Sequence, residues 1–191
     1  MLRSRLLVIV VSAIWLIATT YAYSVMMRFD TRPGMAGNPP LRWPATSQVK
    51  LAKAQRTLLV FLHPKCSCSR ASISQLQNLQ KRLPGKFHTE LVLWQPLNPS
   101  PSWNQLYRTD MGELTGTQVI TDPGGRAAAL FDVHTSGYVL LYGAGGDLQY
   151  AGGLTLARAF DLEGPGIVAM EQIMAGSKTT AAHRPVYGCS F

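Results

Sequence analysis

Two cysteines separated by one residue, Cys66 and Cys68, are the side chains of this 191-residue chain best suited to do chemistry. They follow an apolar run, Leu58–Leu62, that is broken by His63–Pro64. Beyond them, leucine and isoleucine recur at helical spacing up to Leu83. The two sulfurs are therefore expected at a strand-to-helix turn, where unpaired N–H groups and the positive end of the helix dipole favour a thiolate over a thiol.

The residues around this pair also favour a thiolate, because Lys65 and Arg70 add positive charge. Cys66 precedes the helix and is expected to be the more exposed of the two. It is therefore the predicted nucleophile, with Cys68 as the resolving thiol. A disulfide closed over one intervening residue forms a small, strained ring, which suits an oxidant or isomerase better than a reductant.

A third cysteine, Cys189, lies almost at the C-terminus. Because three is an odd number, at least one thiol must be free, change partners or bind a metal. Cys189 is a second resolving thiol if the tail folds back onto the cysteine turn, and a passive tail residue if it does not.

The elements that must position the cysteines follow from periodicity and turn signals. The helix after the first strand is expected to begin with Ser67 or Ser69 as its cap and to end at Pro84–Gly85. Further strands are expected at Phe87–Trp94, Thr117–Thr121, Gly137–Tyr142 and Leu148–Ala151, and further helices at Trp103–Arg108, Ala127–Phe131 and Ile167–Met174. A helix between the first two strands predicts a parallel pair, and the Gly143–Asp147 turn predicts an antiparallel hairpin. The expected fold is a mixed α/β sheet flanked by helices.

A single N-terminal transmembrane helix is expected before this domain, because Leu6–Met27 carries no charged residue. As a helix it would reach about 33 Å, close to the thickness of a bilayer core. A cleaved signal peptide is the alternative. Arg3 and Arg5 favour a cytoplasmic N-terminus and a single pass through the inner membrane. The cysteines then lie on the oxidising periplasmic side, where disulfide chemistry is expected.

The predicted organisation is an anchor over residues 1–27, a tether rich in proline and glycine over residues 28–48, and a folded domain over residues 49–191. The formal charge of +8 is scattered and no recognition motif accompanies it, so no nucleic-acid partner is expected. The expected partners are the membrane, through the N-terminal helix, and a protein or small molecule that carries a thiol or disulfide.

Four segments together resemble the RedB-type, membrane-anchored thioredoxin-like proteins: FLHPKCSCSRAS (Phe61–Ser72), HTSGYVLLY (His134–Tyr142), AGGLTLAR (Ala151–Arg158) and VYGCSF (Val186–Phe191). The resemblance implies a thioredoxin-like fold and a redox role, with Cys66 at the place of the attacking cysteine. The chain differs from ordinary thioredoxins in two ways. It has CxC in place of CxxC, and Ser136–Gly137 in place of a proline before the fourth strand.

The segment Val133–Gly146 also resembles the copper-site strand of Sco-type assembly proteins, which pair a histidine there with two cysteines. The resemblance implies that His134, with Thr135 beside it, approaches the cysteine turn as a base or a loop contact. Two thiolates and an imidazole also form a soft site suited to Cu(I).

Three functions follow. The first is an extracytoplasmic thiol–disulfide oxidoreductase that acts through the CxC motif without a cofactor. The second is Cu(I) binding or delivery, or reduction of thiols at a copper site, with Cys66, Cys68 and His134 as ligands. The third is an anchored binding module without chemistry, because a fold alone does not imply an activity.

Overall fold

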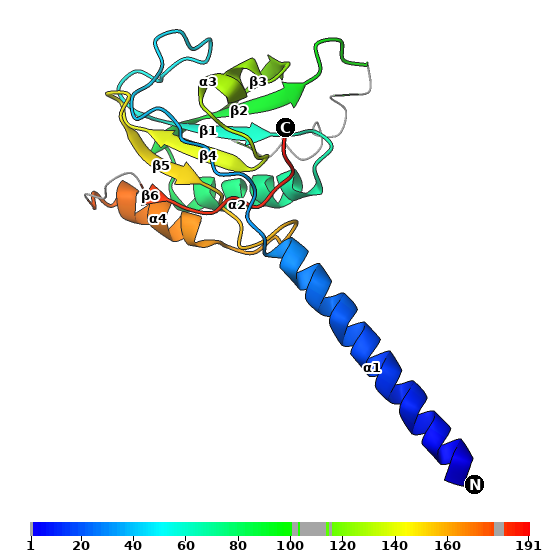
Figure 1. Cartoon of the computed structure of the whole chain (residues 1–191). Helices are drawn as coiled ribbons and strands as arrows, with labels where there is room; N and C mark the ends of the chain where they lie inside the picture. Colours follow the sequence, from blue (N-terminus) through cyan, green and yellow to red (C-terminus); the bar gives the residue numbers. More distant parts are fainter. Residues whose placement is uncertain (1, 101–102, 104–113, 115, 178–181) are drawn as a thin grey trace. The chain divides into compact units, whose positions relative to one another are not determined.

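A computed structural model describes residues 2–100, 103, 114, 116–177 and 182–191 of the chain (Figure 1). These residues form two compact units, Met1–Arg32 and Pro33–Phe191. Of the short helix expected at Trp103–Arg108, only Trp103 lies within the described residues.

The first unit is one helix, α1 (Leu2–Asp30), none of whose side chains is buried within the protein. Its length and apolar composition are sufficient to cross a membrane. The helix runs three residues beyond the predicted end of the anchor at Met27 and includes Arg28 and Asp30. Charged residues end an apolar span in sequence without ending the helical backbone.

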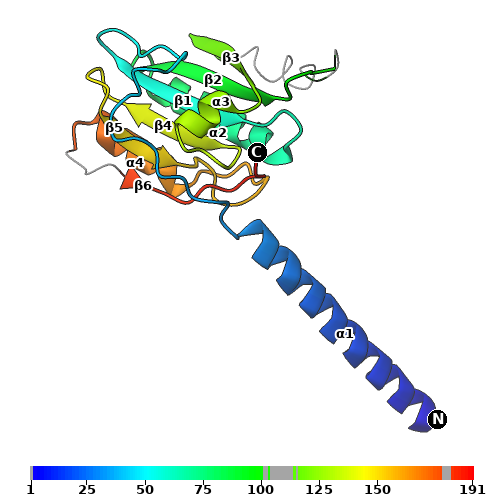
Figure 2. The same cartoon turned by 45° about the horizontal axis from the view of Figure 1, so that its top comes forward.

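The second unit is built on a six-stranded sheet with the order β3-β2-β1-β4-β5-β6 (Figures 1 and 2). The strands are β1 (Arg56–Leu62), β2 (Phe87–Gln95), β3 (Thr117–Pro123), β4 (Tyr138–Tyr142), β5 (Leu148–Gly152) and β6 (Ala182–His183). β1 runs parallel to β2 and antiparallel to β4, and β4 runs antiparallel to β5. The predicted crossover and hairpin are therefore confirmed. β6 was not predicted, because two residues are too few to show a period.

The helices that accompany the sheet are α2 (Ser67–Arg82), α3 (Arg126–Leu130) and α4 (Pro165–Met174). α2 and α4 cover one face, and α3 lies against the other (Figures 1 and 2). This arrangement is the thioredoxin-like mixed sheet that the sequence predicts.

The central strand β1 explains why the sheet is covered on both sides. Leu58, Val60 and Leu62 pack on the α2 and α4 face, and Leu59 and Phe61 pack on the α3 face. All five are at most 1% exposed. A strand buried on both faces has a continuous apolar run in place of an alternating pattern, as the sequence does here.

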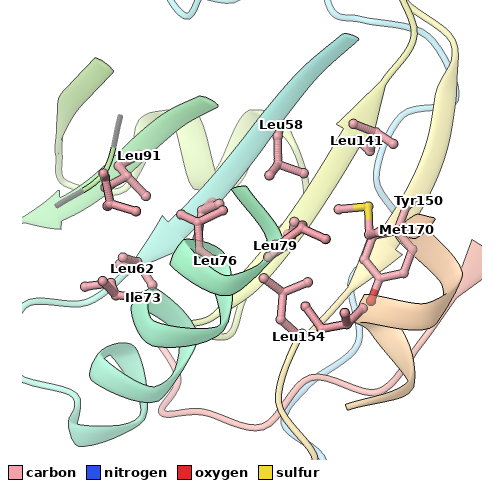
Figure 3. Packing of buried hydrophobic residues seen from close by; sticks show 14 of the residues in the cluster. Leu58, Leu62, Ile73, Leu76, Leu79, Leu91, Leu141, Tyr150, Leu154 and Met170 are labelled. Atoms are coloured by element: carbon pink, nitrogen blue, oxygen red, sulfur yellow. The ribbon is translucent and has the colours of Figure 1, made fainter. Parts of the chain in front are cut away.

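Helix α2 is held to the sheet by side chains spaced three residues apart. Ile73, Leu76 and Leu79 are at most 2% exposed and point into the core shared with β1 (Figure 3). The last turn ends at Leu83, whose N–H donates to the carbonyl of Leu79. This packing fixes the position of the first turn of α2, where the cysteines lie.

The predicted tether is not a free linker, because residues 33–48 lie on the folded domain as a strap. Hydrogen bonds join the strap to distant segments of the domain. Among them are those from Gly34 N–H to Val186 O, from Thr135 Oγ1 to Met35 O and from Asn38 N–H to Asp132 Oδ2. A chain rich in proline and glycine is suited to such an extended path as well as to a linker, and composition alone does not separate the two.

One aromatic side chain secures the strap. The ring of Trp43 meets Phe131 and Tyr142 edge-on, with centroids 5.3 and 5.1 Å apart. The hydroxyl of Tyr142 also donates to the carbonyl of Pro40 at 2.8 Å. Edge-to-face aromatic pairs add to the stabilisation that comes from buried area. The strap is therefore part of the folded unit.

Candidate functional site

The structure brings all three cysteines of the chain together. The Sγ atoms of Cys66, Cys68 and Cys189 lie within 4.8 Å of one another, and we call them the three-sulfur cluster. The Cys66 and Cys189 sulfurs are 2.8 Å apart. The tail therefore folds back onto the cysteine turn, which is the condition under which Cys189 was expected to be a second resolving thiol.

Cys66 occupies the N-cap of α2, with an extended backbone at φ −90° and ψ 120°. The predicted strand-to-helix turn is therefore present, but the capping expectation was wrong. No side chain caps the helix, and the hydroxyl of Ser69 donates to the carbonyl of His63. The expected difference in exposure is also absent, because Cys66 is 3% exposed and Cys68 4%. Cys189 is the exposed member of the cluster.

The hydrogen bonds of the cluster converge on Cys66 and make it the thiolate. The pKa of the Cys66 thiol falls to about 4, chiefly because the Cys68 thiol donates to it. The Cys189 thiol and the backbone N–H groups of Cys189 and Cys68 also donate, and together they outweigh the effect of burial. Donors that converge on one sulfur stabilise its charged form.

The pKa values of the other two thiols shift in the opposite direction. The pKa of Cys68 rises because its thiol donates to Cys66, because it is buried and because the Cys66 thiolate is close. Burial and the same two effects of Cys66 raise the pKa of Cys189 to about 11, although Arg158 lies nearby. At neutral pH the cluster therefore holds one thiolate and two thiols.

Backbone pairing with the loop before β4 holds Cys189 in place. Thr135 and Ser190 form an antiparallel bridge, and the N–H of Ser136 donates to the carbonyl of Cys189 at 2.8 Å. The N–H of Phe191 donates to the carbonyl of His134 at 3.1 Å. The C-terminal segment is thus fixed by its main chain at Cys189 and at the two residues that follow it.

Gly188 allows this close approach. A Cβ atom at position 188 would lie 1.9 Å from the carbonyl oxygen of Ser136, so no other residue fits without moving the tail. The guanidinium of Arg158 donates to the carbonyl of Gly188 and holds the tail from the other side.

Ser136, which stands where thioredoxins carry a proline, ties this loop to the start of α2. Its hydroxyl accepts from the N–H of His63 at 2.8 Å and lies 2.9 Å from the hydroxyl of Ser69. Ser136 is fully buried. Because the N–H of Ser136 also donates to the carbonyl of Cys189, this one residue contacts both segments that carry the cluster.

A second loop reaches Cys68. The backbone N–H of Ala159 points at the Cys68 sulfur. Asp161 holds this loop to α2, because its carboxylate accepts from Ser74 Oγ at 2.8 Å and from Gln75 Nε2 at 2.7 Å. Cys68 is therefore enclosed between α2 and the loop.

An aromatic group borders the cysteine turn. The ring of His63 stacks on Trp94 with centroids 5.1 Å apart, and Trp103 meets it edge-on at 5.9 Å. The ammonium of Lys65 lies 4.3 Å from the centre of the Trp103 ring. Burial lowers the pKa of His63 in spite of the nearby Cys66. His63 is thus a neutral ring at neutral pH.

His134 and Thr135 do not reach the sulfurs with their side chains. His134 Nε2 lies 2.7 Å from Asp132 Oδ1, and the Thr135 hydroxyl donates to the carbonyl of Met35. Among the described residues, the group with ligand atoms close enough to share a metal is the three-sulfur cluster, without a histidine. Cys189 is thus the third member of the site, the position for which the sequence analysis proposed His134. The signal in the sequence that could have identified it is the terminal segment VYGCSF.

Comparison with known proteins extends these observations at the level of the fold. No family model and no curated protein matches the chain. A hypothetical protein from Sinorhizobium meliloti 1021 superposes with a TM-score of 0.60 at 14% identity, over 83% of this chain and 93% of that one. An uncharacterized conserved protein from Geobacillus kaustophilus superposes with a TM-score of 0.60 at 14% identity, over 84% of this chain and 91% of that one. The thioredoxin domain of a thiol–disulfide oxidoreductase from Bacteroides vulgatus superposes with a TM-score of 0.48 at 13% identity, over 75% of this chain and 98% of that one.

The fold follows from the architecture of the chain itself. Its strand order, its strand–cysteine–helix turn and its antiparallel hairpin define a thioredoxin-like fold.

Proposed function

We propose that this chain is a membrane-anchored thiol–disulfide oxidoreductase whose reactive sulfur is Cys66. The observation that carries the proposal is the set of donors around the Cys66 sulfur at the N-cap of α2, which lowers the pKa of its thiol to about 4. A thiolate is the form of cysteine that attacks and leaves in disulfide exchange. Two further thiols within 4.8 Å supply the second electron-donating sulfur.

Exchange by this cluster is balanced in electrons and protons. Oxidation joins the Cys66 sulfur to a second thiol of the cluster and releases two electrons, one proton from that thiol and none from the thiolate. A partner disulfide accepts the two electrons and this proton and is cleaved to one thiol and one thiolate, and the thiolate takes a second proton from water when its pKa lies above the pH. The reverse reaction oxidises a partner dithiol. A protein or a small molecule with a thiol or disulfide serves in either direction, and no cofactor is needed.

We place this chemistry on the periplasmic side of the inner membrane. Helix α1 carries no charged residue between Leu6 and Met27, and Arg3 and Arg5 at its start favour retention of the N-terminus in the cytoplasm. The oxidising side of the membrane is where a disulfide persists. The resemblance to RedB-type proteins supports the same arrangement.

The test is reversible disulfide formation in the full chain in detergent. Equilibration with buffers of reduced and oxidised glutathione, followed by alkylation and mass measurement, should show an intramolecular disulfide that Cys66→Ser abolishes. The control is Ser67→Ala, an exposed change in the same turn, which should leave the equilibrium unchanged. A disulfide that persists in Cys66→Ser, or none in the unchanged chain, contradicts the proposal and favours a binding module without chemistry.

A second candidate function, Cu(I) binding, is supported by the spacing of the three sulfurs. Thiolates are soft ligands that suit Cu(I), and three of them from one cluster can surround one ion. The ligand set becomes Cys66, Cys68 and Cys189, and the site would lose two protons as Cu(I) binds.

The second test is an anaerobic Cu(I) titration of the reduced full chain against a chromophoric chelator. Serine substitution of any one of the three cysteines should weaken binding at least about 100-fold, which is roughly 3 kcal/mol. His134→Ala, which leaves all three sulfurs in place, should have no effect. Binding weaker than the chelator's, or an equal loss in His134→Ala, rejects this second function.

A further inference from the structure

We propose that Cys189 is the disulfide partner of Cys66, and that the sulfur of this exposed residue is the atom a thiol partner attacks. The inference rests on the proposed redox function and assigns its two reacting atoms. Cys68, the resolving thiol expected from the CxC spacing, then serves to position the pair.

Ring strain separates Cys68 from Cys189 as partners for Cys66. Cys66 is the N-cap and Cys68 the second residue of the helix, and their sulfurs lie within 4.8 Å of each other. A bond between them would close a ring over one intervening residue in the first turn of α2, and so small a ring is strained. A bond to Cys189 closes no such ring, and the Cys189 sulfur lies 2.8 Å from that of Cys66.

The backbone of the tail preserves this alignment. The bridge between Thr135 and Ser190 and the bond from Ser136 N–H to Cys189 O hold the tail at Cys189 and directly after it. The ring of Phe191 packs against the core beyond it. Holding two reactants in contact raises their effective concentration and favours the bond between them.

Exposure of the three cysteine residues determines where a partner enters. Cys66 and Cys68 are 3% and 4% exposed, whereas Cys189 is exposed. A partner thiolate therefore meets Cys189 first. Cleavage of the disulfide at that sulfur expels Cys66, and the sulfur of lowest pKa is the best leaving group.

The step balances. The partner thiolate bonds to Cys189 Sγ, the bond between Cys66 and Cys189 breaks, and its electron pair leaves on Cys66. A second partner thiol, once deprotonated, attacks the partner sulfur and releases Cys189, which takes up that proton. The partner dithiol becomes a disulfide, and its two electrons reduce the Cys66–Cys189 bond.

Peptide mapping of the full chain in detergent tests the pairing. Trypsin cleaves after Lys65 and Arg70, so a Cys66–Cys68 disulfide stays within one short peptide, whereas a bond to Cys189 links that peptide to the C-terminal one. After oxidation with glutathione disulfide we expect the linked peptides, both in the unchanged chain and in Cys68→Ser. Brief treatment with reduced glutathione should then place the glutathione on Cys189.

Two results overturn the inference while the redox function stands. They are a disulfide confined to the short peptide, with none formed in Cys68→Ser, and a glutathione adduct on Cys66 in place of Cys189. Absence of any intramolecular disulfide would contradict the proposed function itself.

A glycine variant tests the role of the tail without removing a cysteine. Gly188→Ala places a methyl group against the Ser136 carbonyl, which should displace the tail and lower the equilibrium constant for the linked disulfide at least about tenfold. The matched control is Gly145→Ala, where a Cβ would lie at an ordinary 3.5 Å from Asp147. Equal disulfide formation in both variants would show that the pairing does not depend on the fixed tail.

Discussion

At the scale of single residues, the cluster depends on one thiolate that accepts hydrogen bonds from two thiols. Cys68 donates to Cys66 and also interacts with Cys189 through its thiol. Its own pKa is raised, so it is a poor nucleophile at neutral pH. A buried donor between two reacting sulfurs tunes their pKa values and need not exchange electrons itself.

This role predicts the effect of Cys68→Ala on the pKa of Cys66. Removing the largest of the stabilising donors should raise that pKa above its value of about 4, and Cys189→Ala, which removes the smaller thiol contribution, should raise it less. The pKa is measured from the ultraviolet absorbance of the thiolate as a function of pH. An unchanged titration in Cys68→Ala would contradict the assignment of Cys68 as a donor.

At the scale of elements, the site was predictable where its parts are close in sequence. The run Leu58–Leu62, the break at His63–Pro64 and the helical spacing to Leu83 locate the turn that carries Cys66. These signals are local, because strand, turn and helix each depend on neighbouring residues.

The parts that the sequence left open or placed incorrectly depend on long-range backbone pairing. The bridge from Thr135 to Ser190 is made by main-chain atoms of two irregular segments, and no periodicity marks it. The strap has no hydrophobic period either, and its proline and glycine content is also typical of a linker. It was therefore predicted to be a tether. Cys189 was therefore left with two alternatives, and His134 was assigned a place that the tail fills.

The strap makes a testable contribution to stability. Trp43→Ala removes an aromatic side chain packed edge-on against Phe131 and Tyr142, which should lower the free energy of unfolding by about 2–4 kcal/mol. Leu41→Ala, two residues earlier and 69% exposed, should change it by less than about 0.5 kcal/mol. Denaturant unfolding followed by tryptophan fluorescence and circular dichroism measures both. Equal effects would mean that the strap is not part of the cooperative unit.

At the scale of the whole molecule, the chain consists of an apolar helix and a folded unit that begins at Pro33. Every contact described for the three-sulfur cluster lies in the second unit. The proposed chemistry and the proposed membrane attachment therefore belong to different units of the chain.

Removal of residues 2–32 should release the protein from the membrane. Helix α1 has no buried side chains within the protein, so its apolar surface is available to lipid. Fractionation of cells should find the full chain with the membranes and the shortened chain in the soluble fraction. A shortened chain that remains with the membranes would show that the folded unit binds them itself.

The central claim, that the N-cap cysteine is held as a thiolate by its neighbours, is tested most directly by a pH titration of thiolate absorbance in the reduced full chain. The difference between the unchanged protein and Cys66→Ser isolates one sulfur. Because the pKa is lowered, the thiolate is present above the midpoint and lost as the pH falls through it. The structure predicts a midpoint near pH 4, far below the value near 8.5 of a free cysteine. A midpoint at or above pH 8 would contradict it.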